Sequence, residues 1–173
     1  MSVREYNEYP DTDGDKEVNL FIATSAFDNR DYHCFVGWLN QDDDRFPVYQ
    51  QIHLTGQPGS YNVYIPTVTA ITGSSMRRKI TVSFGQMTKQ QRDKMNQIAS
   101  SLGTQIRTNN FDTTYIQIFQ NLGGTEPFKF DTRTYNCQDW MLIYFRLLEA
   151  NGINVPREAY NKLMTKCAPI LNR

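Results

Sequence analysis

One cysteine stands at the point where a polar stretch of the chain becomes apolar. The segment TYNCQDWMLIYFRLLEANG, residues 134–152, is polar as far as Asp139 and almost continuously apolar from Trp140. Asn136 is the predicted N-cap of a helix, so Cys137 lies at its positive end, beside backbone N–H groups that have no partner within the helix. This environment lowers the pKa of a thiol. Cys137 is therefore either a candidate nucleophile or a small apolar residue of the core.

The chain has two histidines, and both fall on predicted strands. His33 stands at the head of the apolar stretch YHCFVGWLN, and His53 closes the next strand. A neutral imidazole can act as general base toward a thiol, and a second polar group can orient it. A histidine taken singly is more often a hydrogen-bonded strand residue. Two histidines on neighbouring strands, together with Cys137, favour a thiol-based catalytic site.

The first half of the chain has the composition of short strands. Turn-rich pieces separate these strands, which predicts antiparallel hairpins. Within the second strand, Tyr32 to Leu39 is apolar on both alternating faces, so this strand is predicted to be central and covered on both sides. Cys34 points to the opposite face from His33 and is predicted to lie in the core. The five predicted strand segments are VNLFIATSAF, YHCFVGWLN, RFPVYQQIHL, YNVYIPTVTAI and RRKITVSFGQM.

Helical patterns fill the second half. TKQQRDKMNQIASSLG has Thr88 as a predicted N-cap, one apolar face and Gly103 as a stop signal, whereas DTTYIQIFQNLGG fits either a helix capped by Asp112 or a strand. The stretch from Cys137 is apolar around nearly its whole circumference and predicts a buried helix closed by Gly152. VPREAYNKLMTKCAPI predicts a last helix. Strands followed by helices predict an α+β fold, an antiparallel sheet packed against helices.

Length and composition predict one folded domain of residues 17–173, preceded by a mobile tail of residues 1–16 that lacks apolar periodicity. Lysine plus arginine equals aspartate plus glutamate, 18 each, so no basic surface for nucleic acid is expected. Arg146 and Glu149 interrupt the most apolar segment, so no transmembrane segment is expected either.

The cysteine pattern and the N-terminus bear on compartment and cofactors. Three unevenly spaced cysteines do not form a disulfide framework, and the polar N-terminus lacks the pattern of a signal peptide. These features predict a cytoplasmic protein in which thiols stay reduced. The paired Cys and His spacings of a zinc site are absent from the sequence, and neither a metal nor a cofactor is expected.

The order of the candidate residues resembles that of a group of thiol enzymes. YHCFVGWLN is similar to the histidine strand, and YNCQDW to the start of the cysteine helix, of the circularly permuted branch of the papain-like NlpC/P60 superfamily. This branch includes lecithin:retinol acyltransferase-like proteins and PPPDE-type peptidases, and the chain also resembles uncharacterised fungal proteins with the same order. QQIHLTG resembles the strand of a second histidine. The resemblance implies a permuted papain-like fold with Cys137 as nucleophile, His33 as general base and His53 as the orienting residue.

The activity implied by this resemblance is that of a cysteine-dependent hydrolase or acyltransferase that works through a thioester. Its substrate would be a protein or a small amide or acyl compound. Amide bonds are favoured over lipid esters, because the sequence has no amphipathic or basic membrane-binding segment. The alternative is a binding or regulatory module that has the same fold without the chemistry. The sequence leaves the substrate and the oligomeric state open.

Overall fold

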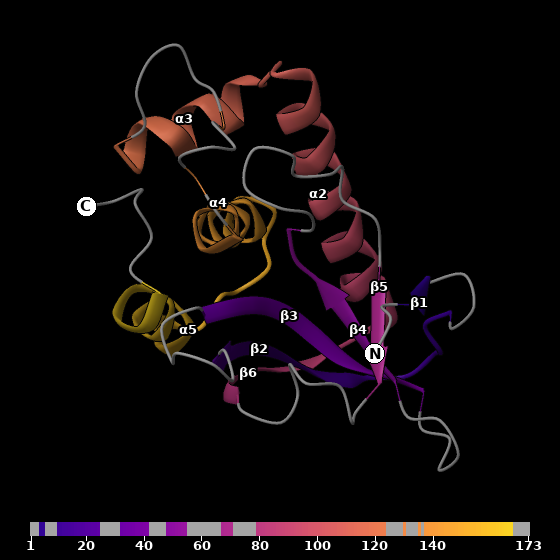
Figure 1. The fold of residues 1–173 in the computed structure, drawn as a ribbon. Coiled ribbons are helices and arrows are strands. Elements are labelled where there is room, and N and C mark those ends of the chain that lie inside the picture. Colours follow the sequence, from indigo (N-terminus) through magenta and orange to yellow (C-terminus); the bar gives the residue numbers. More distant parts are fainter. Residues whose placement is uncertain are drawn as a thin grey trace. The chain divides into compact units, whose positions relative to one another are not determined.

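The computed structural model describes residues 4–5, 10–24, 32–41, 48–54, 67–70, 79–123, 130, 135 and 137–167. The chain has an α+β fold in which the strands precede the helices, as the sequence predicts (Figure 1). Its contacts divide it into two compact units. The first comprises Met1–Ile52 and Ile65–Asn96, and the second comprises His53–Tyr64 and Gln97–Arg173.

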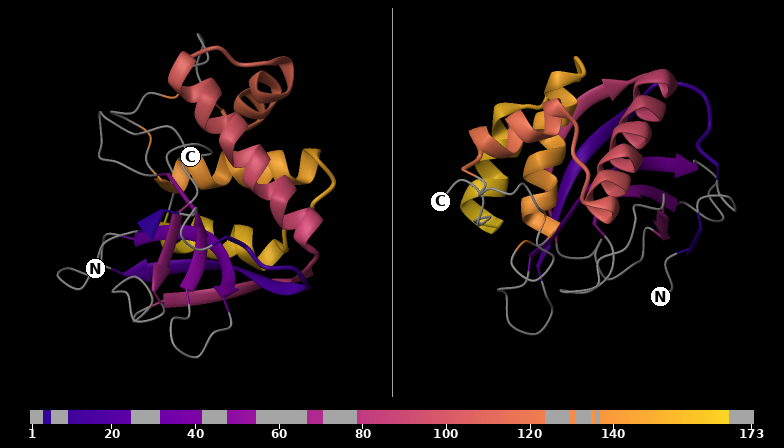
Figure 2. Two further views of the ribbon diagram at one scale, coloured as in Figure 1. Left: turned by 90° about the vertical axis from the view of Figure 1, so that its right-hand side faces the viewer. Right: turned by 90° about the horizontal axis from the view of Figure 1, so that it is seen from above.

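In the described part of the first unit, six strands form an antiparallel sheet in the order β1-β5-β4-β3-β2-β6. Figure 2 shows these strands side by side. Each of the five predicted strand segments overlaps one of the strands β2 to β6, although β2 begins two residues before its segment and β3 ends one residue after its own. Strand β1 has only two residues and is too short to give a sequence pattern. The strands are β1 (Arg4–Glu5), β2 (Lys16–Thr24), β3 (Tyr32–Gln41), β4 (Val48–Ile52), β5 (Thr67–Ala70) and β6 (Lys79–Met87).

The prediction that β3 is central is confirmed, because β3 pairs with β2 on one side and with β4 on the other. Phe35 and Val36 are both fully buried, and successive side chains of a strand point to opposite faces, so both faces of the sheet are covered here. One face carries Phe35 against Phe21, with 4.9 Å between the ring centroids. The other carries Trp38, and the guanidinium carbon of Arg92 lies 5.9 Å from its ring centroid. We call these the Phe35 face and the Trp38 face.

Helix α2 (Lys89–Thr108) begins with the predicted cap. The hydroxyl of Thr88 accepts from the backbone N–H of Gln91 at 3.2 Å, and the Gln91 side chain accepts from the backbone N–H of Thr88 at 2.9 Å. This reciprocal pair satisfies two N–H groups that the helix leaves without partners. The sequence predicts that the helix stops at Gly103, and this prediction is wrong. One interior glycine costs only about 1 kcal/mol, so the helix continues through it to Thr108. Asn109 follows with a φ of 50°, which ends the helix.

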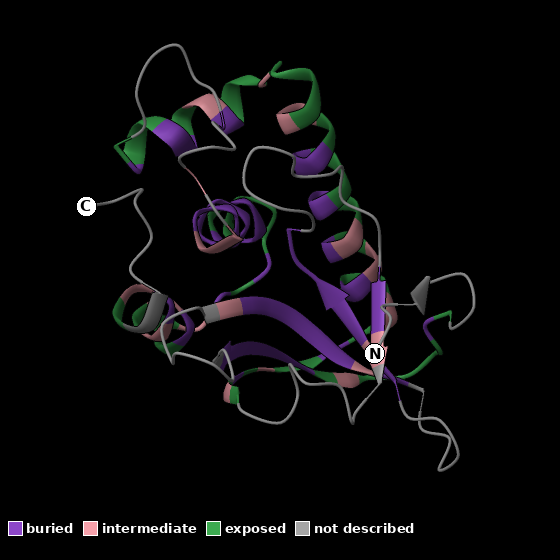
Figure 3. Ribbon diagram, in the orientation of Figure 1, coloured by how far each residue is buried: buried purple, intermediate pink, exposed green. Residues whose placement is uncertain are grey.

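The second unit holds the remaining helices. The segment that fitted either a helix or a strand is helix α3 (Thr113–Asn121), and Asp112 caps it by accepting from the backbone N–H of Tyr115 at 3.1 Å. Helix α4 spans Cys137–Ala150, and nine of its residues are buried, so the purple of buried positions runs around its circumference in Figure 3. The chain then leaves α4 through Gly152, with a φ of 78°.

Helix α5 (Arg157–Lys162) follows Pro156 and continues as a π-helical segment, η2 (Leu163–Cys167). Tyr160 of α5 packs edge-on against Phe145 of α4, with 5.3 Å between ring centroids. The guanidinium carbon of Arg146 lies 4.8 Å from the centre of the Tyr160 ring. Burial raises the pKa of the Tyr160 hydroxyl above its usual 10.0, and the Glu149 carboxylate adds to this effect.

This raised pKa predicts a loss of stability in alkali. Above about pH 10 the unfolded chain releases the Tyr160 proton while the native protein keeps it, so the free energy of unfolding falls as the pH rises. The loss is at most about 1.4 kcal/mol per pH unit, the limit for one proton. Urea unfolding of wild type and Tyr160→Phe between pH 9 and pH 11.5 tests this, because the phenylalanine variant lacks the proton. The stability of wild type relative to the variant is expected to decline with pH, and a constant difference would contradict the assignment.

Candidate functional site

Cys137 is the first residue of α4 and is partly exposed. The residues that follow it, from Asp139 to Phe145, are all buried, so the helix that carries the thiol is fixed by packing. The thiol lies at the positive end of the helix dipole, where the first backbone N–H groups have no partner within the helix. The predicted cap, Asn136, lies outside the described residues. This position can favour a thiolate and offer N–H donors to an oxyanion.

A carboxylate lies in the same helical turn. Asp139, in the first turn of α4, is completely buried. A buried carboxylate is stable only with hydrogen-bonding or charged partners. One sign of this burial is visible in the sequence: Asp139 directly precedes the apolar run that starts at Trp140.

The two histidines occupy different environments. His33 is the second residue of β3, partly exposed on the Phe35 face, with 5.9 Å between its ring centroid and that of Phe35. Cys34 points to the opposite face and is fully buried, as predicted. His53 directly follows β4 and is 7% exposed. His53 and Cys137 belong to the second unit and His33 to the first, so the pairing of His33 with Cys137 stays a prediction.

A second polar site, which the sequence did not predict, is centred on Arg92 in the first unit. Its side chain is fully buried, and Nε donates to Asp11 Oδ2 at 2.9 Å. The other guanidinium nitrogens donate to the backbone carbonyl oxygens of Thr12, Gly14 and Met87 at 2.9, 2.7 and 2.8 Å. Four hydrogen bonds therefore join the first turn of α2 to residues 11–14 and to the end of β6.

Lys16 extends this cluster. Its ammonium donates to Asp11 Oδ1 at 2.7 Å, to the Thr12 hydroxyl at 2.8 Å and to the Asn40 carbonyl oxygen at 2.8 Å. The carboxylate of Asp11 thus has a cation on each oxygen, and its side chain is fully buried. Residues 10–16 fall in the stretch predicted as a mobile tail. The mobile tail was predicted because this stretch lacks apolar periodicity. Its residues 11–16 are instead held to the first unit by ion pairs and hydrogen bonds of charged side chains.

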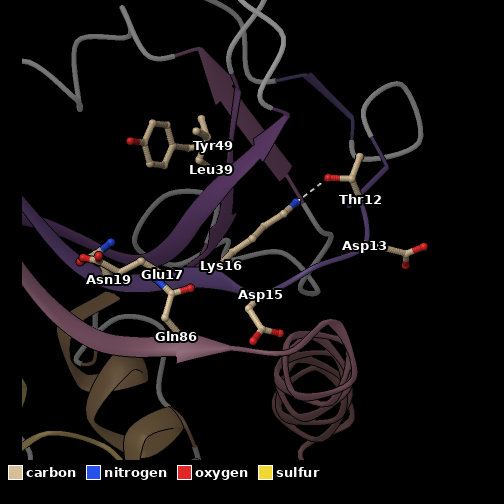
Figure 4. A pocket seen from close by; sticks show the side chains of 9 residues that line it. All are labelled: Thr12, Asp13, Asp15, Lys16, Glu17, Asn19, Leu39, Tyr49 and Gln86. Carbon is tan, nitrogen blue, oxygen red and sulfur yellow. Dashed lines mark hydrogen bonds between the residues drawn. The ribbon is translucent and has the colours of Figure 1, made fainter.

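A pocket of about 530 Å³ opens beside this cluster, within the first unit (Figure 4). Burial raises the pKa of Tyr49, one of its residues, and the charge of Glu17, another, adds to the effect, so the two side chains interact electrostatically. The pocket is lined by Thr12, Asp13, Asp15, Lys16, Glu17, Asn19, Leu39, Tyr49 and Gln86.

Comparison with known proteins gives no match for this chain, whether with protein-family models, with curated proteins or with solved structures. Within the described ranges, no helix combines the length and the apolar character needed to cross a membrane. In the same part of the chain, no group of three or more His, Cys, Asp or Glu side chains is arranged to hold a metal ion.

Proposed function

We propose that the chain is a cysteine-dependent hydrolase or acyltransferase with a permuted papain-like fold. The observation that supports this most is the position of Cys137, a partly exposed thiol on the first residue of a helix that is otherwise mostly buried. Packing keeps such a thiol in one place, and the helix dipole favours its nucleophilic form. The proposal includes a cytoplasmic location, where the thiol stays reduced.

In the proposed reaction His33 takes the proton of the Cys137 thiol, and His53 orients His33. The sulfur attacks a carbonyl carbon, and backbone N–H groups at the start of α4 stabilise the oxyanion. The leaving group departs with a proton from His33, which leaves a thioester on Cys137. Water or a second acceptor then releases the acyl group. A peptide, isopeptide or side-chain amide is the favoured substrate.

Thiol alkylation as a function of pH tests this proposal. Native protein is treated with iodoacetamide, and the labelling rate of each cysteine is measured by mass spectrometry. Cys137 is expected to label at pH 6.5 about tenfold faster than the same cysteine in urea-unfolded chain, since lowering the pKa by one unit from about 8.5 gives tenfold more thiolate. Cys34, which is fully buried, provides the internal reference for a native thiol that should hardly label.

The histidine variants separate catalysis from simple exposure. His33→Ala is expected to slow the labelling of Cys137 at pH 6.5, and His53→Ala to slow it less, with circular dichroism confirming that both variants fold. The enzyme proposal would be contradicted if the pH dependence of Cys137 labelling matches that of an ordinary thiol and the rate is the same in His33→Ala. That result would leave the alternative, a binding or regulatory module with the same fold.

A further inference from the structure

The pocket of the first unit has an unusual balance of hydrogen-bonding groups. Its volume of about 530 Å³ lies within the range of ligand sites, which is about 300–1,000 Å³. Three of its residues are carboxylates, Asp13, Asp15 and Glu17, and none of them takes part in an ion pair among the described residues. Among the described lining residues Lys16 is the one cation, and its ammonium donates to Asp11, Thr12 and Asn40. The described lining therefore carries more carboxylates than cations, and its lysine already has other partners.

Asn19 supplies an independent sign of a ligand. Its side chain lines the pocket, the residue is only 8% exposed, and Oδ1 has no hydrogen-bond partner among the described residues. Figure 4 shows Asn19 with Glu17 and Gln86 on the same wall. A buried acceptor without a donor destabilises the folded protein, so a bound N–H group at this position would stabilise it.

The strand register explains why this acceptor is left without a donor. Asn19 of β2 pairs with Gly37 of β3, and Gly37 pairs with Gln51 of β4, so the three residues form one row on the Phe35 face. Gly37 has no side chain to offer a hydrogen bond. Gln51, at the other end of the row, is 3% exposed, and its Oε1 also lacks a partner in the described part of the chain. Acceptors, not donors, are therefore in excess along this row.

The aromatic residues next to the pocket already interact with an ammonium group. Tyr49 lines the pocket and meets Phe21 edge-on, with 5.6 Å between the ring centroids. The Lys79 ammonium nitrogen lies 5.5 Å from the Tyr49 ring centroid and 4.9 Å from that of Phe21. Aromatic rings attract cations at such distances. The aromatic rings and the carboxylates thus both favour a positively charged ligand.

We infer that this pocket binds a small organic cation, an amine or a guanidine with several N–H donors. Carboxylates and an amide oxygen are acceptors, and a guanidinium offers donors in a planar fork that matches carboxylates. An organic cation fits better than a metal ion, since the described residues contain no group of three metal-ligating side chains. The inference is independent of the thiol chemistry proposed for Cys137, because no residue of the pocket takes part in it.

The test uses two probes of the same shape and different charge. N-acetylarginine amide carries a guanidinium, and N-acetylcitrulline amide carries a neutral urea group in its place. Each is titrated into the ¹⁵N-labelled chain of 173 residues at about 0.15 M salt, where exposed charges more than about 8 Å apart are largely screened. The arginine compound is expected to give saturable shifts at the amides of Glu17, Asn19 and Gln86. The citrulline compound is expected to bind at least about tenfold more weakly, since a neutral urea group forms weaker hydrogen bonds with carboxylates than a guanidinium does.

Variants locate the binding. Glu17→Gln removes one exposed carboxylate and Asn19→Leu removes the buried acceptor, and each is expected to weaken binding of the arginine compound about tenfold. Asp93→Asn is the matched control, because Asp93 is a partly exposed carboxylate of α2 that pairs with Lys89 and does not line the pocket. It changes the net charge as Glu17→Gln does and should leave binding unchanged.

Three results would overturn the inference. Putrescine serves as a second probe, which carries ammonium groups in place of the guanidinium. The first result is the absence of saturable shifts with both the arginine compound and putrescine. The second is equal binding of the arginine and citrulline compounds. The third is equal weakening by Asp93→Asn and Glu17→Gln, which would indicate general charge attraction. Glu17 is exposed, so its variant keeps the test decisive even where Asn19→Leu does not fold.

Discussion

Replacing Arg92 with leucine is expected to lower the free energy of unfolding by about 3–5 kcal/mol, the cost of removing one partner from a buried ion pair. Arg92 is fully buried and makes four hydrogen bonds, one to the Asp11 carboxylate and three to backbone carbonyl oxygens. Leucine leaves all four acceptors without these donors. Asp11 keeps Lys16 as a partner, at 2.7 Å, so its charge is not left alone. The loss should therefore stay within that range.

Urea denaturation of the purified variants measures this cost. Arg92→Lys keeps the charge but loses the planar fork that reaches several acceptors at once, so its cost should be intermediate. Arg107→Leu is the control, because Arg107 is exposed in the last turn of the same helix. Losing its interaction with the helix dipole should cost less than about 1 kcal/mol. Equal effects of Arg92→Leu and Arg107→Leu would show that the buried cluster contributes nothing specific.

The same substitution bears on the pocket. Arg92 holds the backbone carbonyl groups of Thr12 and Gly14, and the segment between Thr12 and Glu17 supplies five of the lining residues. A variant that loses these bonds frees this wall of the pocket. Binding of a guanidinium probe should therefore weaken in Arg92→Leu, although Arg92 itself does not line the pocket.

The elements that follow from periodicity were predictable, and those that depend on single polar pairs were not. Alternation with apolar residues on both faces identified β3 as central, and Thr88 was identified as a cap because its side chain acts within three residues. Gly103 misled the prediction, since a glycine inside a helix and a glycine that ends one look alike in sequence. Asn109 ends α2 because it adopts a positive φ, which asparagine tolerates better than most residues.

The candidate sites divide in the same way. Cys137 was located because a change from polar to apolar residues is visible along the chain, whereas the Arg92 cluster joins residues 81 positions apart. Nothing near Asp11 in sequence indicates that partner. The pocket is a similar case, because Glu17, Tyr49 and Gln86 come from three different strands. Their meeting depends on the strand order β4-β3-β2-β6, which local patterns do not specify.

Replacing Trp140 with alanine should cost about 3–5 kcal/mol of unfolding free energy, the usual cost of truncating a buried tryptophan. Trp140 is fully buried in α4 and stacks on Tyr144 one turn later, with 5.2 Å between ring centroids. Alanine removes the indole and leaves a cavity that the neighbouring side chains cannot fill completely. Trp140→Phe keeps an aromatic ring and should cost less. Gln117→Ala, on an exposed position of α3, should change the stability by less than about 0.5 kcal/mol.

Trp140 also links the stability of the second unit to the chemistry proposed for Cys137, which lies three residues before it on α4. If packing of α4 fixes the thiol at the helix N-terminus, loosening the helix removes the influence of the dipole on that thiol. In folded Trp140→Ala, Cys137 should then react with iodoacetamide at pH 6.5 more slowly than in wild type. Its labelling rate should approach that of the unfolded chain. A variant that is destabilised by the full amount and yet keeps the wild-type labelling rate would show that the reactivity of Cys137 does not depend on the packing of its helix.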